Sequence, residues 1–124
     1  MKRFLPVLLL PLFLCGCATT FTNLTPLEQS RNEKNLYPVE VAFDSRQQTL
    51  RWESIQPKIL VGNREYTMQA TPVLTNRWEG LVPVAPGASQ VQYRYKFDFK
   101  FNQMGDLPGN NSALSPVYTL KIKD

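Results

Sequence analysis

The amino-acid sequence predicts an all-β domain, an antiparallel β-sandwich of about six or seven short strands. Two observations favour this fold class: apolar and polar residues alternate with period two in several segments, and Gly, Pro and Asn residues separate those segments. No segment shows the 3.6-residue periodicity of an amphipathic helix over a convincing length. Because many short strands joined by turns bury their apolar faces against one another, two packed sheets are expected.

The first half of the domain contains strands bounded by polar connections. Their expected ranges are residues 37–44, 49–53, 57–61 and 64–70. In the first of them, apolar residues occupy every second position and predict one buried face. These residues are Tyr37, Val39, Val41 and Phe43. The Gly62-Asn63 pair predicts a tight hairpin turn between the last two strands, because Gly readily adopts the positive φ that such a turn needs.

The second half contains the clearest strand, over residues 91–101. Its alternate positions are apolar without exception: Val91, Tyr93, Tyr95, Phe97, Phe99 and Phe101. This strict alternation favours an aromatic core over a ligand platform. Further strands are expected over residues 78–84 and 117–123. A long loop rich in Gly, Pro and Asn is expected over residues 104–115.

The amino-terminal segment has the three parts of a secretory signal peptide: a positive start at Lys2 and Arg3, an apolar run over residues 4–14, and a small residue, Gly16, at the cleavage site. The apolar run is roughly half of the about 20 residues that cross a bilayer. The sequence Leu14-Cys15-Gly16-Cys17 resembles the lipobox of bacterial lipoproteins. That resemblance implies cleavage after Gly16, with a diacylglyceryl group and an N-acyl chain such as palmitate on Cys17. Ordinary secretion with a free Cys17 is the alternative.

These features divide the chain into three parts: a signal peptide at 1–16, a lipidated amino terminus and tether at 17–35, and a β-sandwich domain at 36–124. The tether is expected because residues 18–35 are rich in Thr, Asn and charged residues and show no regular periodicity. Ala18 follows the lipobox cysteine. In lipoproteins of Gram-negative bacteria, the absence of Asp at that position implies the outer membrane rather than the inner membrane.

The composition excludes several classes of function. The 124-residue chain contains no His, so Ser-His-Asp triads and zinc sites of the Cys/His type are impossible. Removal of residues 1–16 leaves one Cys, which cannot form an intramolecular disulfide. It also leaves 12 basic and 10 acidic residues, because Lys2 and Arg3 are lost from the 14 Lys and Arg. A net charge of +2 without a basic cluster argues against nucleic-acid binding.

Two tryptophans are candidate ligand contacts. Trp52 lies in the polar sequence Arg51-Trp52-Glu53, where an exposed ring could stack on a sugar or a peptide. Trp78 is the second candidate. Either ring could instead fill the space between the two sheets.

The carboxylates are expected on the polar sides of strands or beside turns, where solvent normally surrounds them. They are Asp44, Glu53, Glu65, Glu79 and Asp98. Although a carboxylate pair can hydrolyse glycosides, we predict no catalytic residue, metal site or cofactor. The basic row of Arg94, Lys96 and Lys100 is expected to keep its sheet soluble. The long loop over residues 105–115 suits contact with another protein or is disordered.

The domain resembles the immunoglobulin-like sandwiches of bacterial cell-surface lipoproteins, an uncharacterised group of envelope proteins. The likeness lies in residues 31–37, which lead into the first expected strand, and in residues 57–68, a strand, a Gly turn and Tyr-x-Met. It implies a non-enzymatic, lipid-anchored module that contacts or scaffolds another envelope protein.

A second likeness is to starch- and glycogen-binding modules. It rests on Trp78, on Pro86-Gly87 and on the aromatic and basic residues 93–97. It implies the alternative function, a carbohydrate-binding module held at the cell surface.

Overall fold

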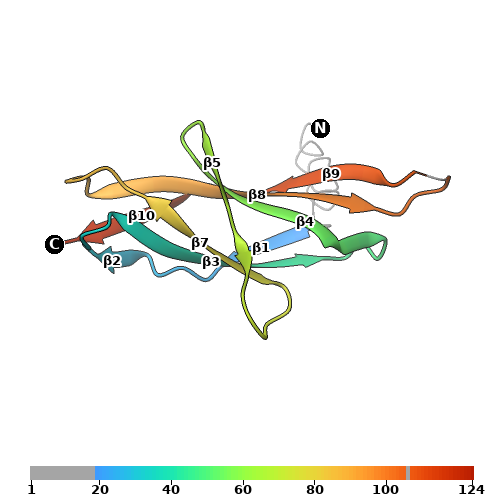
Figure 1. The fold of residues 1–124 in the computed structure, drawn as a ribbon, viewed down its shortest axis with the longest axis horizontal. Coiled ribbons are helices and arrows are strands. Elements are labelled where there is room, and N and C mark those ends of the chain that lie inside the picture. The colour runs from blue at the N-terminus through green and yellow to red at the C-terminus, as the bar shows by residue number, and fades with distance from the viewer. Residues whose placement is uncertain (1–18, 106) are drawn as a thin grey trace, which may run out of the picture.

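A computed structural model describes residues 19–105 and 107–124, and every regular element in these residues is a β-strand (Figure 1). The strands are β1 (Thr19–Asn23), β2 (Glu28–Ser30), β3 (Leu36–Ser45), β4 (Leu50–Val61), β5 (Arg64–Thr67), β6 (Gln69–Ala70), β7 (Arg77–Pro83), β8 (Gln90–Phe101), β9 (Gly109–Leu114) and β10 (Tyr118–Lys123). Within this described part of the chain, no helix is long and apolar enough to cross a membrane.

The strands form two sheets that pack face to face, which confirms the predicted β-sandwich. The first sheet has the order β1-β3-β7-β6, and the second has the order β2-β10-β8-β4-β5, with β9 also paired to β8. Neighbouring strands are antiparallel except β2 and β10, which are parallel. The order β1-β3-β7-β6 facing β10-β8-β4 matches strands A, B, E and D facing strands G, F and C of immunoglobulin domains, while β2, β5 and β9 are additional to that set.

The core is aromatic, as the strand pattern predicts. The inward positions of β3 and β8 are buried, with Tyr37, Phe43, Tyr95 and Phe97 among the largest fully buried side chains. Phe43 on the first sheet meets Phe97 on the second with ring centroids 4.9 Å apart. Each large apolar side chain contributes roughly 1.5–3 kcal/mol on burial, so this core supplies stabilisation of the kind that disulfides add in other small domains.

The structure differs from the sequence prediction at the expected tether, because Thr19–Asn23 forms β1 and Glu28–Ser30 forms β2. Thr19–Asn23 pairs along its whole length with β3, and Phe21 packs at 5.0 Å from Phe43 and 5.2 Å from Phe97. The sandwich therefore includes strands that precede residue 36, from Thr19 onward. Only one apolar residue of β1 faces the core, so its sequence contains no alternation of apolar and polar residues from which a strand could be predicted.

A buried hydrogen-bond network fixes the crossing from β1 to β2. The Thr25 hydroxyl accepts a hydrogen bond from the Glu40 amide at 2.9 Å and lies 3.3 Å from the Tyr95 hydroxyl. Tyr95 Oη donates to Asn23 Oδ1 at 2.7 Å, and Asn23 Nδ2 donates to Tyr93 Oη at 2.8 Å. Burial raises the pKa of Tyr95, so this hydroxyl keeps its proton and its role in the network.

The region expected as a loop over residues 104–115 also differs, since Gly109–Leu114 is strand β9. Strand β8 is longer than β10, so β10 pairs with its first part and β9 with its second part. The break between them is at Ser115 and Pro116. Ser115 is buried, and its hydroxyl accepts a hydrogen bond from the Tyr95 amide at 2.8 Å.

The two strands expected over residues 49–53 and 57–61 are one strand, β4, with an irregularity between Arg51 and Gln56. The hairpin predicted at Gly62-Asn63 is confirmed, since Val61 pairs with Arg64 across the turn. Gly62 has a φ of 61°, as the first residue of a type II′ turn requires. The predicted signal peptide, its cleavage site Gly16 and the lipidation site Cys17 lie outside the described residues.

Candidate functional site

A groove of about 870 Å³ lies over the outer face of the first sheet, the face turned away from the core. We call it the outer-face groove. Its floor is formed by β3 and β7, one wall by the connection after β1 and the other by residues of β5 and β6. The lining residues are Leu24, Thr25, Pro26, Leu36, Pro38, Val39, Glu40, Tyr66, Thr67, Gln69, Glu79, Gly80, Leu81 and Pro83.

Three cross-strand pairs make the floor of the outer-face groove. Leu36 lies opposite Pro83, Pro38 opposite Leu81, and Glu40 opposite Glu79. These residues face outward because the alternate positions of both strands, such as Tyr37 and Val82, are buried. Two of the three rows are therefore apolar on a sheet face that solvent would ordinarily surround, with Leu81 49% exposed.

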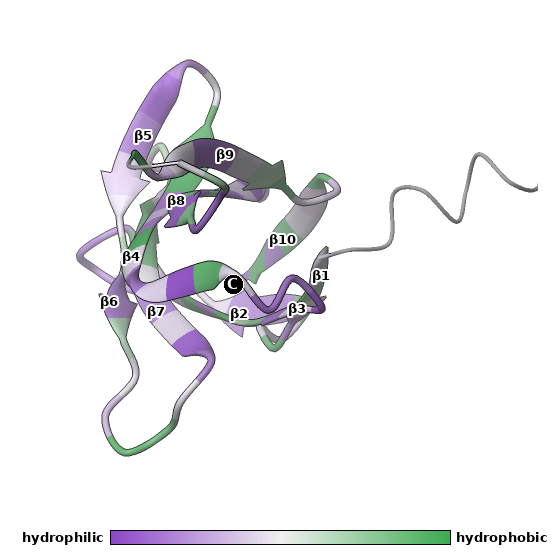
Figure 2. Ribbon diagram, turned by 90° about the vertical axis from the view of Figure 1, so that its right-hand side faces the viewer, coloured by the Kyte–Doolittle hydropathy of each residue, from purple (hydrophilic) through white to green (hydrophobic). Residues whose placement is uncertain are grey.

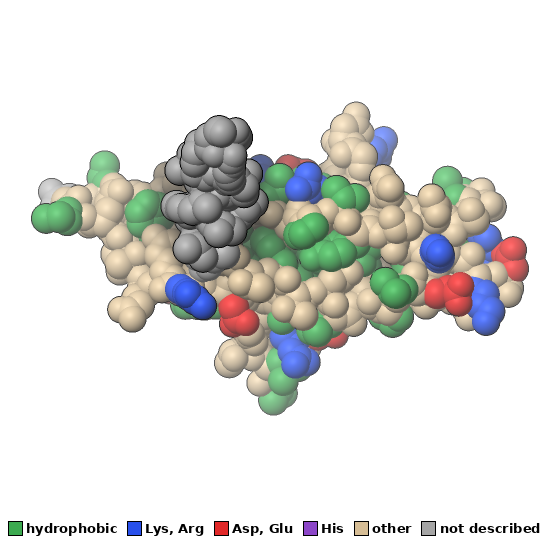
Figure 3. Space-filling view, turned by 180° about the vertical axis from the view of Figure 1, so that it is seen from behind, with side chains coloured by type: hydrophobic (Ala, Val, Ile, Leu, Met, Phe, Trp, Pro, Cys, Tyr) green, Lys and Arg blue, Asp and Glu red, His purple; other side chains and the backbone are tan. Residues whose placement is uncertain are grey.

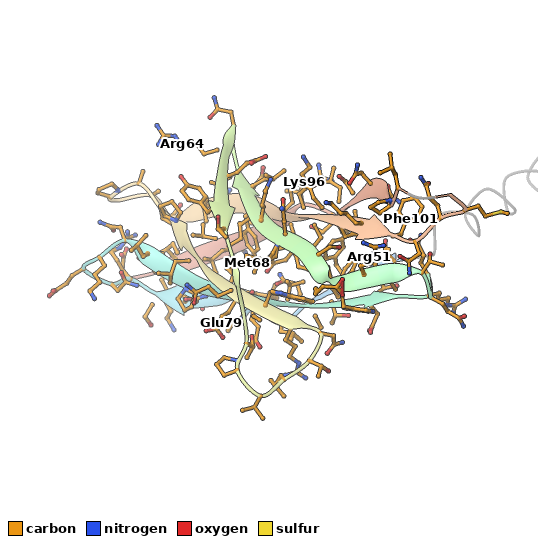
Figure 4. The ribbon with its side chains drawn as sticks, turned by 45° about the vertical axis from the view of Figure 1, so that its right-hand side comes forward. Arg51, Arg64, Met68, Glu79, Lys96 and Phe101 are labelled. Atoms are coloured by element: carbon orange, nitrogen blue, oxygen red, sulfur yellow. The ribbon has the colours of Figure 1, made fainter. Side chains whose placement is uncertain are left out.

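Gly80 in β7 lies where neighbouring side chains leave no room for a Cβ atom. A Cβ at this position would lie 2.8 Å from Ile59 Cδ1 and 3.3 Å from Met68 Cγ. Met68 lies where the chain passes from β5 to β6, crossing from the second sheet to the first (Figure 4). The small residue lets this crossing segment pack against β7 and form a wall of the groove.

The charges of the groove have one sign. Of its lining residues only Glu40 and Glu79 are charged. Figure 4 shows Glu79 on the side of the sandwich opposite Lys96, which belongs to the second sheet. The surface of the groove is thus apolar along two rows and acidic in the third.

The two predicted tryptophan contacts lie next to each other. Their ring centroids are 6.5 Å apart and their planes differ by 6°. Trp52 comes from β4 and Trp78 from β7, so the pair connects the two sheets. Trp78 packs edge-on against Phe43 and Phe97 and is partly buried, whereas Trp52 is 44% exposed.

A charged cluster occupies the outer face of the second sheet. Lys58 Nζ lies 3.2 Å from Asp98 Oδ2 and 3.6 Å from Glu65 Oε1, while Lys96 Nζ lies 3.9 Å from Asp98 Oδ1. Ser112 donates a hydrogen bond to Asp98. This hydrogen bond, followed by the two lysines, holds the pKa of Asp98 below its usual value. The hydrogen bond with Asp98 and the charge of Glu65 raise the pKa of Lys58.

The other carboxylates named from the sequence are exposed: Asp44, Glu53, Glu65 and Glu79. Across residues 19–105 and 107–124, no group of three or more His, Cys, Asp or Glu side chains is placed to hold a metal ion. Of the basic row, Arg94 donates to the Ser115 carbonyl and Lys96 pairs with Asp98, while Lys100 is exposed.

Two hairpin loops carry exposed apolar side chains. The loop between β6 and β7 projects from the sandwich with a hydrophobic tip, formed by Val73 and Leu74 (Figure 2). Val73 is fully exposed with a φ of 71°, a strained conformation for a β-branched residue. The loop between β8 and β9 exposes Met104 and Leu107.

Charged side chains gather at the end of the sandwich that carries the C-terminus. Figure 3 shows Lys, Arg, Asp and Glu side chains there, and Arg31 pairs with Asp124 at this end.

The sequence did not point to the outer-face groove. Its apolar residues come from β3 and β7, and they become neighbours only through the register of the two strands. A signal was present nonetheless, since Leu36, Pro38, Leu81 and Pro83 occupy strand positions where polar residues are usual.

No protein-family model and none of the curated proteins matches this chain.

Proposed function

We propose that the protein is a non-enzymatic, lipid-anchored module of the bacterial cell envelope that contacts another envelope protein through the outer-face groove. The anchor is the acylated Cys17, and the outer membrane or cell surface is the proposed location. One observation carries the contact role: two rows of apolar residues lie open on a sheet face next to an acidic row. Exposed apolar patches on soluble domains commonly mark interaction sites.

The position of β1 bears on the anchoring. Cys17 precedes Thr19, the first residue of β1, by two positions in the sequence. Two residues span at most about 7 Å. Acyl chains on Cys17 would therefore hold the sandwich close to the lipid surface, without the tether that the sequence suggested.

A photo-crosslinking amino acid placed at Leu81 tests the contact role in intact membranes. We expect a discrete adduct with another protein, because Leu81 lies in the middle of the three rows that form the groove floor. The same amino acid at Gln92, an exposed residue of β8 in the second sheet, is the matched control. The adduct at residue 81 should disappear with Leu36→Asp in the same groove. Equal labelling from residues 81 and 92 would contradict the proposal.

The Trp52–Trp78 pair favours a second candidate, the carbohydrate-binding module. A half-exposed indole backed by a parallel indole offers a rigid apolar surface on which a sugar ring can stack. Glycan binding that is lost in Trp52→Ala, with the circular dichroism spectrum unchanged, would support this alternative. No binding to polysaccharides at millimolar sugar concentrations would exclude it.

A further inference from the structure

Glu40 and Glu79 form a pair of like charges in the outer-face groove. They are directly opposite each other in the register of β3 and β7. Side chains in such positions have Cβ atoms about 4.5–5.5 Å apart, and like charges there destabilise a sheet. Two carboxylates at this spacing create a local site of negative potential.

No cation of the described residues neutralises this pair. The ion pairs found in residues 19–105 and 107–124 involve Arg31, Lys58 and Lys96, and none of them reaches Glu40 or Glu79. Arg77 occupies the next outward position of β7, opposite Ala42, and forms no ion pair with Glu79. Glu79 accepts one hydrogen bond, from the Thr71 hydroxyl at 3.3 Å. The carboxylates therefore keep acceptor capacity for a ligand.

The apolar rows continue directly from the acidic pair. Pro38 and Leu81 are two residues further along their strands, and Leu36 and Pro83 two residues beyond those. At about 3.3 Å per residue, the apolar floor reaches about 13 Å from the acidic row. A ligand that fills the groove therefore needs a cation at one end and apolar groups over this length.

Resting on the proposed contact function, we infer that the outer-face groove binds an amphipathic segment of a partner protein, with a Lys or Arg side chain held between Glu40 and Glu79. The apolar side chains of that segment cover Pro38, Leu81 and the row beyond. On an α-helix, at 1.5 Å per residue, the contact would span about two and a half turns. The cation fixes the register, and the apolar floor supplies the buried area.

Peptide binding to the mature chain, residues 17–124 carrying Cys17→Ser, tests this inference. The probes are a fluorescent amphipathic helix of Leu and Lys and its twin with Glu at every Lys position. We expect the Lys peptide to bind more tightly than the Glu peptide. Glu40→Gln with Glu79→Gln should weaken Lys-peptide binding about tenfold, as expected for the loss of two partly desolvated ion pairs. Leu81→Ser should weaken it by a similar factor.

The control is the pair Glu33→Gln and Glu53→Gln, which changes the net charge equally at exposed positions outside the groove. It should alter Lys-peptide binding less than about twofold. Thermal unfolding of each variant checks that it is folded. Equal effects of the two double variants, or equal binding of both peptides, would overturn the inference. If the Leu81 crosslink persists in that case, the contact function stands and only the cationic partner is wrong. If the crosslink is absent, the contact function itself fails.

Discussion

Asp98 is the carboxylate with the most partners in the described residues, with Ser112, Lys58 and Lys96 around it. Sequence reasoning placed it on the polar face of its strand but could not foresee these contacts. Ser112 was expected in a loop, and its contact with Asp98 exists because β9 pairs with β8. The same limit applied to Trp52 and Trp78. Each was a plausible contact by itself, and only the two-sheet packing brings the rings together.

Ser112→Ala should destabilise the protein by about 1 kcal/mol at neutral pH, because it removes the largest cause of the lowered pKa of Asp98. A group whose pKa is lower in the folded state stabilises the fold above its unfolded pKa and loses that effect as the pH falls through its folded pKa. The difference in the free energy of unfolding between the variant and the wild type should therefore be smaller near pH 2 than at neutral pH. Urea unfolding at pH 7 and at pH 2 measures this difference. Ser89→Ala, at an exposed position whose side chain makes no hydrogen bond in the described residues, is the control. A pH-independent difference would contradict this role.

At the scale of elements, strands with many alternating apolar residues were predictable from the sequence. Strands that form only because a neighbouring strand pairs with them were not. Strands β3 and β8 carry four or more core positions each and can be recognised alone. Strand β9 consists mainly of Gly, Asn and Ser, which favour turns. It forms a strand because the far part of β8 has a free edge that needs backbone hydrogen bonds. Such tertiary pairing overrides local propensity.

The β4–β5 hairpin gives a test of turn chemistry. Gly62→Ala should destabilise the protein by about 1–2 kcal/mol, because an L-residue is strained at a φ of 61°. Nothing lies within 4 Å of a Cβ at Gly62, so the cost is conformational and not steric. Asn63→Ala, at the next turn position, where φ is not positive, should cost clearly less. Chemical denaturation measures both, and equal losses would argue against the type II′ turn.

At the scale of the whole molecule, the two ends of β3 separate the proposed anchor from the outer-face groove. Thr19 pairs with Ser45 at one end of β3, whereas the apolar row of Leu36 and Pro83 lies at the other end. Nine residues separate Leu36 from Ser45, which corresponds to about 30 Å. An anchor next to Thr19 would therefore place the acidic row nearer the lipid and the open apolar end of the groove away from it, where a partner can reach it.

This arrangement predicts which end of the sandwich lies near lipid. In the proposed lipoprotein, cleavage after Gly16 would remove Cys15 and acylation would block Cys17, so a single introduced Cys would be the one free thiol. A fluorophore on Arg46→Cys, beside the Thr19 end of β3, should be quenched strongly by nitroxide-labelled lipid in vesicles. A fluorophore on Lys34→Cys, at the opposite end, should be quenched much less, because a nitroxide quenches only at short range and the two ends are about 30 Å apart. Unacylated protein carrying Cys17→Ser should stay off the vesicles and show no quenching at either position. Equal quenching at both ends of the acylated protein would mean that the sandwich lies flat on the bilayer, and it would contradict the upright orientation.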